Sequence, residues 1–341
     1  MSQRAKNDVF TRISLIPPLR PIAPDAGSSL DCTYNYAKRM EVTYTNDPVS
    51  AWKWAEEHLG FSQSKDPSSI RVVGFDVESA PNLPWRRDDT YFGPATLQLA
   101  VHDNVLVLQI AQESVGHLYE NLRFVEAVLN QSSLLLTGVG MDQDMIELYR
   151  WSDEMAKRRK GHPEKLLAVD NPLRLDIGGI GAESIGARGG TAGLKRLAAA
   201  ILQVQLQKSS KLAQSPWAKA PLTQKCVVYA ARDAWTSAAV LHRLCQFDAQ
   251  RFSPSVLKEL VQQYQEALKA DDKATTVEEL SIQASARRKY KLQWKELREK
   301  GKEFCTEAEN KRLDYLQERI KELAPPQPIS FETEESLGIR V

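Results

Sequence analysis

The sequence predicts an α/β fold followed by a helical region. Short apolar runs typical of strands, such as Val72 to Phe75, alternate with stretches whose apolar residues recur at the helical period. The clearest helical stretch runs from Lys225 to Leu244. With 341 residues, the chain can form one domain of roughly 200 residues and an accessory part. We divide it into an N-terminal arm or targeting segment, a main domain, helical accessory elements and a tail: residues 1–40, 41–250, 251–325 and 326–341.

The N-terminal segment has two interpretations. Residues 1–20 contain four basic residues against Asp8 alone, with Ser and Thr interspersed and apolar residues at near-helical spacing. This composition is typical of a mitochondrial presequence, and an arm lying over the main domain is equally consistent with it. A basic run at 157–160 offers a competing nuclear signal or a solvated helix end. We expect an intracellular protein, with a mitochondrial location favoured over a nuclear one.

Composition narrows the class of protein. Lys and Arg total 45 against 44 Asp and Glu, so any nucleic-acid affinity must come from local patches. The four cysteines are scattered without zinc-finger spacing, which predicts free thiols and no disulfides. No apolar run approaches the ~18 residues of a membrane span. We therefore expect no membrane contact.

Local sequence patterns predict five elements of the main domain, one helix and four strands. Residues 40–44 predict a strand, and Asp47-Pro48 marks the start of a helix. Residues 97–101 and 105–110 predict two more strands beside the strand that carries Asp76.

Carboxylates stand out in three separated patches. Asp76 and Glu78 lie two apart in a strand-like run, so both side chains point to the same face. Asp144 follows an apolar strand and a turn through Gly138 and Gly140, near a strand-to-helix junction.

The third patch lies in the long helical stretch. Tyr229 and Asp233 are four residues apart there, so they share one face of the helix. An isolated acid of this kind is usually a solvated edge residue, or one that favours a helix start. The joint pattern of the three patches is what favours catalysis.

The three patches resemble those of the DEDD superfamily of 3′-to-5′ exonucleases. The matching segments are Phe-Asp-x-Glu at 75–78, Gly-Val-Gly-x-x-x-Asp at 138–144 and Tyr-Ala-Ala-x-Asp-Ala at 229–234, and the resemblance extends over residues 40–247. Tyr229 identifies the Tyr-containing branch, which includes ribonuclease D and the Werner-type exonuclease, because Val228 stands where the sibling branch has His. The resemblance implies a ribonuclease H-like mixed sheet flanked by helices.

The resemblance also implies a mechanism. Asp76, Glu78 and Asp233 would hold one divalent metal ion, and Asp76 with Asp144 would hold the second. Four converging acids need compensating cations, and an all-oxygen site suits Mg²⁺ or Mn²⁺. The two ions would activate a water molecule, which Tyr229 would orient, and stabilise the leaving 3′ oxygen. The expected reaction releases nucleoside 5′-monophosphates from single-stranded RNA 3′ ends.

Three alternatives remain open at this stage. The motifs do not distinguish RNA from DNA, and a Werner-type DNA exonuclease is the alternative enzyme. RNA is favoured because no helicase or polymerase part accompanies the domain. A protein that keeps the fold only for binding is expected to have lost an acid, and none is missing here. An RNA-binding scaffold in an RNA-processing complex stays open as the third alternative because of the charged C-terminal region.

A glycine-rich stretch at 178–193 does not match a dinucleotide fingerprint, because Ser184 stands where the third glycine belongs. We expect a flexible loop there.

The C-terminal region contains a basic run and two capping boxes. Residues 286–302 hold eight basic residues against two acidic ones, with Tyr290 and Trp294 among them. Such a mixture suits single-stranded nucleic acid, and the candidate contacts are Arg287, Arg288, Lys289, Lys291 and Trp294. The alternative is a helical arm that packs on the main domain through Tyr290, Trp294 and Leu297. Thr275 with Glu278 and Thr306 with Glu309 predict two helix starts.

Overall fold

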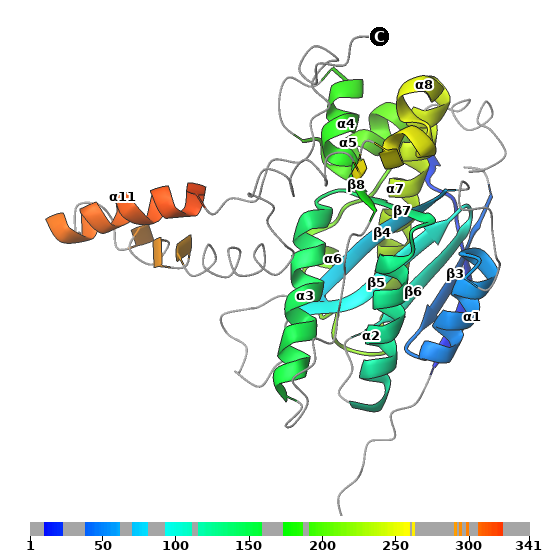
Figure 1. Ribbon diagram of the computed structural model, residues 1–341, viewed down its shortest axis with the longest axis horizontal. Helices are drawn as coiled ribbons and strands as arrows, with labels where there is room; N and C mark the ends of the chain where they lie inside the picture. Colours follow the sequence, from blue (N-terminus) through cyan, green and yellow to red (C-terminus); the bar gives the residue numbers. More distant parts are fainter. Residues whose placement is uncertain are drawn as a thin grey trace, which may run out of the picture.

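A seven-stranded mixed sheet forms the centre of the computed structural model (Figure 1). Its strand order is β1-β3-β6-β5-β4-β7-β8, with β3/β6, β4/β7 and β7/β8 parallel and the other pairs antiparallel. The strands are β1 (Thr11–Ile16), β3 (Met40–Thr45), β4 (Arg71–Ala80), β5 (Gly93–Val101), β6 (Asn104–Gln109), β7 (Leu134–Gly138) and β8 (Arg174–Asp176). The structure describes residues 10–22, 38–61, 70–80, 93–110, 115–158, 173–186, 191–259, 261–262, 290–291, 293–294, 298–299 and 306–322.

Helices cover both faces of this sheet. The helices are α1 (Pro48–His58), α2 (Val115–Asn130), α3 (Met141–Arg158), α4 (Ile177–Ser184), α5 (Leu194–Leu197), the π-helix η1 (Ala198–Leu202), α6 (Ser210–Ala213), α7 (Gln224–Phe247), α8 (Ala249–Phe252) and α11 (Glu307–Glu322). Apolar side chains of α1, α2 and α3 share one core cluster with one face of the sheet, whereas those of α4, α5, η1 and α7 share the second cluster with the other face. The predicted α/β fold, a mixed sheet flanked by helices, is confirmed.

The strand β4 divides its side chains between the two faces. Val73, Phe75 and Val77 belong to the cluster with α1, α2 and α3. Because strand side chains alternate, Asp76 and Glu78 face α7 instead. The expected strands at 97–101 and 105–110 are β5 and β6, and the helix predicted at Asp47-Pro48 is α1, capped by the Asp47 carboxylate.

One close backbone contact fixes α7 on the sheet. A Cβ atom on Gly74 of β4 would lie 1.9 Å from the carbonyl oxygen of Ala234 in α7. No residue other than glycine fits there without displacing the helix. Since Ala234 follows Asp233, this contact sets how far Asp233 lies from β4.

The N-terminal segment contributes to the sheet. The near-helical spacing expected there is wrong for Thr11–Ile16, which is the edge strand β1 and pairs antiparallel with β3. The side chains of Ile13 and Leu15 are exposed, so this strand has apolar residues on its solvent-facing side. A second short strand, β2 (Arg20–Pro21), pairs with β9 (Val204–Gln205). Residues 11–16 and 20–21 are thus part of the fold, and both the targeting role of the N-terminal segment and the cellular location stay predictions.

The glycine-rich stretch is not a loop over its first half. Ile177–Ser184 forms the buried helix α4, with Asp176 as its N-cap. A Cβ atom on Gly181 would lie 2.6 Å from Leu197 Cδ2, so glycine here permits close packing of α4 against α5. The expectation of a flexible loop is therefore wrong for this segment.

In the C-terminal region, Leu257 and Val261 pack in the core of the main domain, whereas the described residues from 290 onward contact one another. The capping box predicted at Thr306 is confirmed: its hydroxyl accepts from the Glu309 N–H at 3.2 Å, and Glu309 accepts from the Thr306 N–H at 2.8 Å. Tyr290 contacts Tyr315 of α11 edge-on, with ring centres 6.5 Å apart, and α11 stands apart from the sheet (Figure 1). Tyr290 thus packs within the C-terminal region, on α11.

Other expectations fall partly outside the described residues. The structure does not describe the capping box predicted at Thr275 or four residues of the basic segment: Arg287, Arg288, Lys289 and Leu297. Cys226 and Cys245 are free thiols, whereas Cys32 and Cys305 are outside the described residues. Among the helices that the structure describes, none has the length and apolar character needed to cross a bilayer.

Replacing Gly74 with Ala should lower the free energy of unfolding by at least about 1–3 kcal/mol, because a methyl group would be forced against the α7 backbone. Urea unfolding measures the loss. Gly193→Ala is the matched control, since a Cβ atom there has nothing within 4 Å. Equal stability of the two variants would show that α7 does not depend on this contact.

Candidate active site

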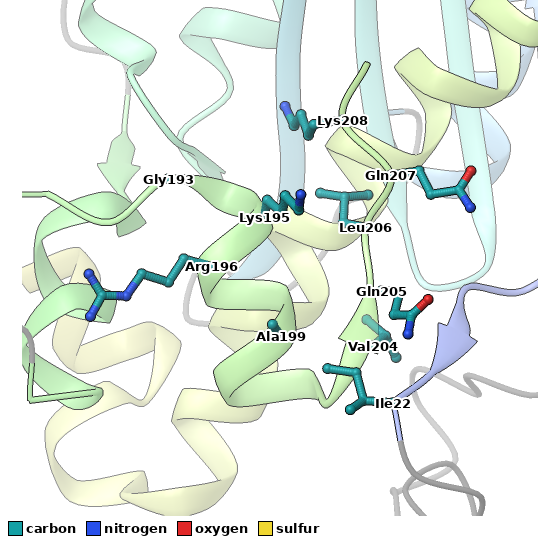
Figure 2. A pocket seen from close by; sticks show the side chains of 10 residues that line it. All are labelled: Ile22, Gly193, Lys195, Arg196, Ala199, Val204, Gln205, Leu206, Gln207 and Lys208. Atoms are coloured by element: carbon teal, nitrogen blue, oxygen red, sulfur yellow. The ribbon is translucent and has the colours of Figure 1, made fainter. Parts of the chain in front are cut away.

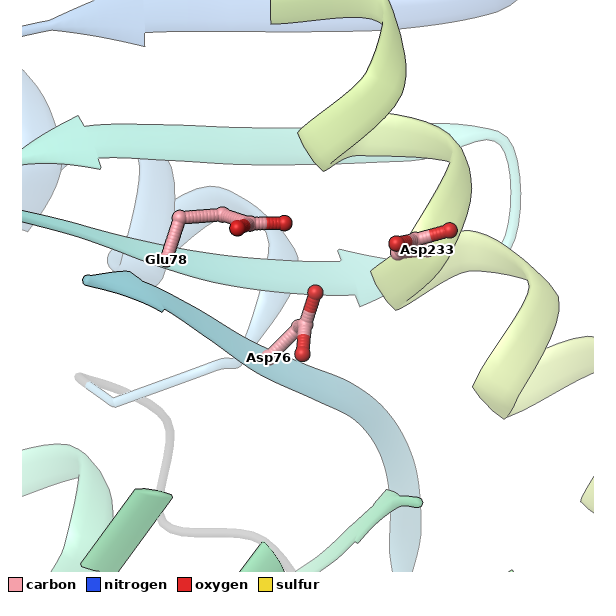
Figure 3. Close-up of side chains that lie close together, drawn as sticks. All are labelled: Asp76, Glu78 and Asp233. Atoms are coloured by element: carbon pink, nitrogen blue, oxygen red, sulfur yellow. The ribbon is translucent and has the colours of Figure 1, made fainter. Parts of the chain in front are cut away.

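Three carboxylates converge between β4 and α7. One carboxylate oxygen from each of Asp76, Glu78 and Asp233 lies within 4.8 Å of the others. Figure 3 shows Asp76 and Glu78 extending from β4 toward Asp233. The sequence-based expectation that these three acids meet is therefore confirmed. We call this group the acid cluster.

Asp144 lies beside the acid cluster but outside the group of three. It belongs to the first turn of α3, just after β7, as the predicted strand-to-helix junction requires. Its charge helps to raise the pKa of Glu78, and that of Asp76 helps to raise the pKa of Asp144. The fourth acid is therefore within electrostatic reach of the other three.

The environment of the acid cluster opposes ionisation. Burial and the charge of Asp233 raise the pKa of Asp76 to about 7. Burial and the charges of Asp76 and Asp233 raise the pKa of Glu78 to about 10. Burial likewise raises the pKa values of Asp144 and Asp233. Divalent cations would compensate the negative charge of these oxygen ligands once they ionise, so the residues present fit an Mg²⁺- or Mn²⁺-type ion.

Lys208 is the basic residue that reaches the acid cluster. Its Nζ atom lies 2.5 Å from Asp233 Oδ2 and 5.5 Å from the centre of the Tyr229 ring. Burial lowers the pKa of Lys208, but Asp233 and Asp76 raise it more, so the net direction is upward. A metal ion bound by Asp233 would therefore have to share this carboxylate with Lys208 or displace it.

Tyr229 lies one helical turn before Asp233, as predicted. It is buried and donates a hydrogen bond that lowers the pKa of Asp233. Burial and the charge of Asp233 raise the pKa of Tyr229, so its hydroxyl stays protonated at neutral pH. The group can donate and accept hydrogen bonds at the edge of the acid cluster.

Asp176 is an acid near the site that sequence reasoning missed. Its Oδ1 accepts from Gly178 N–H at 2.7 Å as the N-cap of α4, and its Oδ2 accepts from Gly140 N–H at 2.7 Å. It thereby ties the segment that precedes Asp144 to β8. The only sequence signal was an acid before a short apolar run, which is too common to single out.

Comparison with known proteins agrees with this geometry. The sequence profile of a family described as 3′-5′ exonuclease matches residues 60–247, which is more than half of the chain. The chain belongs to this 3′-5′ exonuclease family. All five predicted site residues of the exonuclease lie within the matched region.

Individual relatives of this exonuclease are distant. It is 29% identical over 187 residues to the human exonuclease mut-7 homolog, which covers 52% of this chain and 20% of that protein. The chain thus matches about a fifth of the length of that relative.

Two solved structures are similar at low identity. The EXO domain of Aedes aegypti Nibbler is 16% identical, with a TM-score of 0.44, covering 68% of this chain and 97% of that one. The catalytic core of Trypanosoma brucei RRP6 is 12% identical, with a TM-score of 0.45, covering 85% of this chain and 76% of that one.

The raised pKa values predict how stability depends on pH. Between about pH 4 and pH 7 the folded, metal-free protein keeps a proton on Asp76 that the unfolded chain releases. The folded state therefore binds more protons, and the contribution of this group to the free energy of unfolding falls as the pH rises. In EDTA, Asp76→Asn should flatten this fall, whereas Glu56→Gln on α1 should not.

Added Mg²⁺ or Mn²⁺ should raise the melting temperature more at pH 8 than at pH 5, because metal ions bind the deprotonated carboxylates. Thermal unfolding at both pH values, with EDTA or with metal, measures both effects. An equal metal shift at the two pH values would contradict the assignment of the acid cluster.

Asp176→Ala should lower the free energy of unfolding by about 0.5–2 kcal/mol, the usual effect of losing an N-cap, and should also slow nucleotide release. Asp47→Ala is the matched control, because Asp47 caps α1 in the same way but lies away from the acid cluster. Urea unfolding and turnover of a labelled oligonucleotide give the two readouts. If both variants lost stability and kept full turnover, Asp176 would have no positioning role.

Proposed function

We propose that this chain is a metal-dependent exoribonuclease that releases nucleoside 5′-monophosphates from the 3′ ends of single-stranded RNA. The observation that carries the proposal is the convergence of Asp76, Glu78 and Asp233, with one oxygen of each within 4.8 Å of the others. Membership of the 3′-5′ exonuclease family supports the same reaction. RNA is the preferred substrate and DNA the alternative.

The four acids would together bind two divalent cations. Asp76, Glu78 and Asp233 would hold one divalent ion, and Asp76 with Asp144 would hold the second. When bound, two such ions supply the charge that activates a water molecule and stabilises the leaving oxygen. The raised pKa values of the four carboxyls support a cation site here, because burial leaves these charges uncompensated by the protein alone.

Tyr229 would orient the attacking water. Its hydroxyl already bonds to Asp233, and its raised pKa keeps the proton in place. Lys208 would neutralise Asp233 between turnovers and would be free to contact the scissile phosphate once a cation takes its place. Each of these roles needs only side chains that already lie at the acid cluster.

The C-terminal basic residues are a secondary part of the proposal. Lys291 is exposed, and the guanidinium of Arg298 lies 4.7 Å from the centre of the Trp294 ring. We propose that this segment adds RNA affinity, either for substrate or within an RNA-processing complex.

Asp76→Asn and Asp144→Asn should each abolish nucleotide release while the far-ultraviolet circular dichroism stays unchanged, because they remove metal ligands rather than packing. The assay uses matched 5′-labelled RNA and DNA oligomers with Mg²⁺ or Mn²⁺, and Glu56→Gln as the control variant. EDTA should inactivate the wild type reversibly. Full turnover in either Asn variant would remove the two-metal assignment, and faster digestion of DNA would favour the alternative substrate.

Tyr229→Phe should slow single-turnover cleavage by roughly 10²–10⁴ and leave oligonucleotide affinity little changed, since only the water-orienting hydroxyl is lost. Rapid-quench kinetics separates the rate from binding. Tyr315→Phe on α11 is the control. A variant that keeps its rate and loses affinity would make Tyr229 a binding residue.

A further inference from the structure

A groove of about 730 Å³ opens beside the acid cluster. One wall is formed by α5 and η1, and the other by β9 and the residues that follow it up to Lys208 (Figure 2). Ile22 lies at the end of the groove away from Lys208 (Figure 2). The volume falls within the range of roughly 300–1,000 Å³ typical of pockets that bind small ligands.

The groove forms because the chain changes direction after the π-helix η1. The helix α5 continues as η1, and Gln203 then adopts a left-handed backbone with φ 54°. This turn sends β9 back along the same helix, and β9 is held by pairing with β2. The Ile22 N–H donates to the Gln203 carbonyl at 2.8 Å. The N-terminal segment thereby fixes the second wall and closes its far end.

The lining combines positive charge with apolar surface. Lys195, Arg196 and Lys208 line the groove, and the described lining residues include no acid. The exposed apolar part of the lining comes from Ala199 and from Ile22 at the far end. In Figure 2 Lys195 extends toward Leu206, which is buried. Cations beside an apolar wall suit a chain that carries phosphates on one side and flat bases on the other.

Lys208 connects the groove to the acid cluster. The same residue lines the groove and places its Nζ atom 2.5 Å from Asp233. A strand whose 3′ end lies at the acid cluster would therefore continue past Lys208 into the groove. A small separate ligand would have no reason to need this continuity.

We propose that this groove holds the nucleotides immediately 5′ of the scissile linkage of a single-stranded RNA, with Lys195 contacting a backbone phosphate. The bases lie against the exposed apolar surface of Ala199 and Ile22. This inference rests on the proposed function and adds to it a binding site outside the acid cluster. It also gives the N-terminal segment a role in substrate binding through Ile22.

The test measures binding rather than turnover. Wild-type full-length protein and Lys195→Gln are titrated into 5′-labelled oligouridylates of two and six nucleotides, with Ca²⁺ in place of Mg²⁺ and the labelled strand checked for intactness. Fluorescence anisotropy is followed from 50 to 300 mM salt. Lys53→Gln is the matched control, because Lys53 is an exposed lysine on α1, which packs on the opposite face of the sheet.

Lys195→Gln should weaken binding of the six-nucleotide strand about three- to fivefold near 0.15 M salt. It should also flatten the slope of the logarithm of the binding constant against the logarithm of salt concentration by about 0.7, because one phosphate contact on a single strand contributes that amount. Binding of the dinucleotide should not change, because its one internucleotide phosphate is the scissile one, which lies at the acid cluster, and none remains for Lys195. Lys53→Gln should match the wild type for both strands. An unaltered slope for Lys195→Gln, or equal losses on both strands, would overturn the proposal.

A second variant tests the groove by volume. Ala199 is exposed and lines the groove, so Ala199→Phe should narrow it without disturbing the core. It should weaken the six-nucleotide strand and spare the dinucleotide, at an unchanged melting temperature. Wild-type affinity for the longer strand would contradict the proposal. Cleavage by the wild type in Mg²⁺ or Mn²⁺ is scored separately, so that a protein that binds in the groove and never cleaves refutes only the proposed function.

Discussion

The active-site geometry depends on the contact between Gly74 of β4 and the Ala234 carbonyl of α7. The absence of a side chain at Gly74 lets the helix lie against the strand, where a Cβ atom would be 1.9 Å from that oxygen. Asp233 directly precedes Ala234 in the helix, and Asp76 is the next residue after Gly74 on the same face of the strand. Because α7 cannot move closer or rotate without losing it, the separation of the carboxylates follows from backbone packing.

The same packing creates an electrostatic cost. Burial raises the pKa values of Asp76, Glu78 and Asp233, and the charges of neighbouring acids add to the rise for Asp76 and Glu78. Lys208 offsets part of the charge through its ion pair with Asp233. The segment that carries Lys208 is itself held by the β2–β9 pair. An N-terminal strand, a lysine and a catalytic carboxylate are therefore linked in one chain of contacts.

How far the sequence predicted this site depended on the range of each interaction. Strand alternation placed Asp76 and Glu78 on one face, and helical spacing placed Tyr229 beside Asp233, because both rules act over a few residues. Asp176 and Lys208 were not identified as site residues, since their partners Gly140 and Asp233 lie 36 and 25 residues away. The strand β1 was mistaken for a helical segment because Phe10, Ile13 and Ile16 recur at steps of three residues, and because the apolar Ile13 lies on its exposed face. The helix α4 was missed because its glycines, which usually break helices, serve close packing against Leu197.

The central claim is that the acid cluster binds divalent cations in competition with Lys208. The most direct measurement is a titration of metal-free protein with Mn²⁺, in which electron paramagnetic resonance reports the unbound ion. The account predicts about two ions per chain for the wild type, the number a two-metal site requires. It also predicts tighter binding by Lys208→Met and loss of at least one ion from Asp233→Asn. Unchanged binding by Asp233→Asn, at wild-type stoichiometry and affinity, would contradict it.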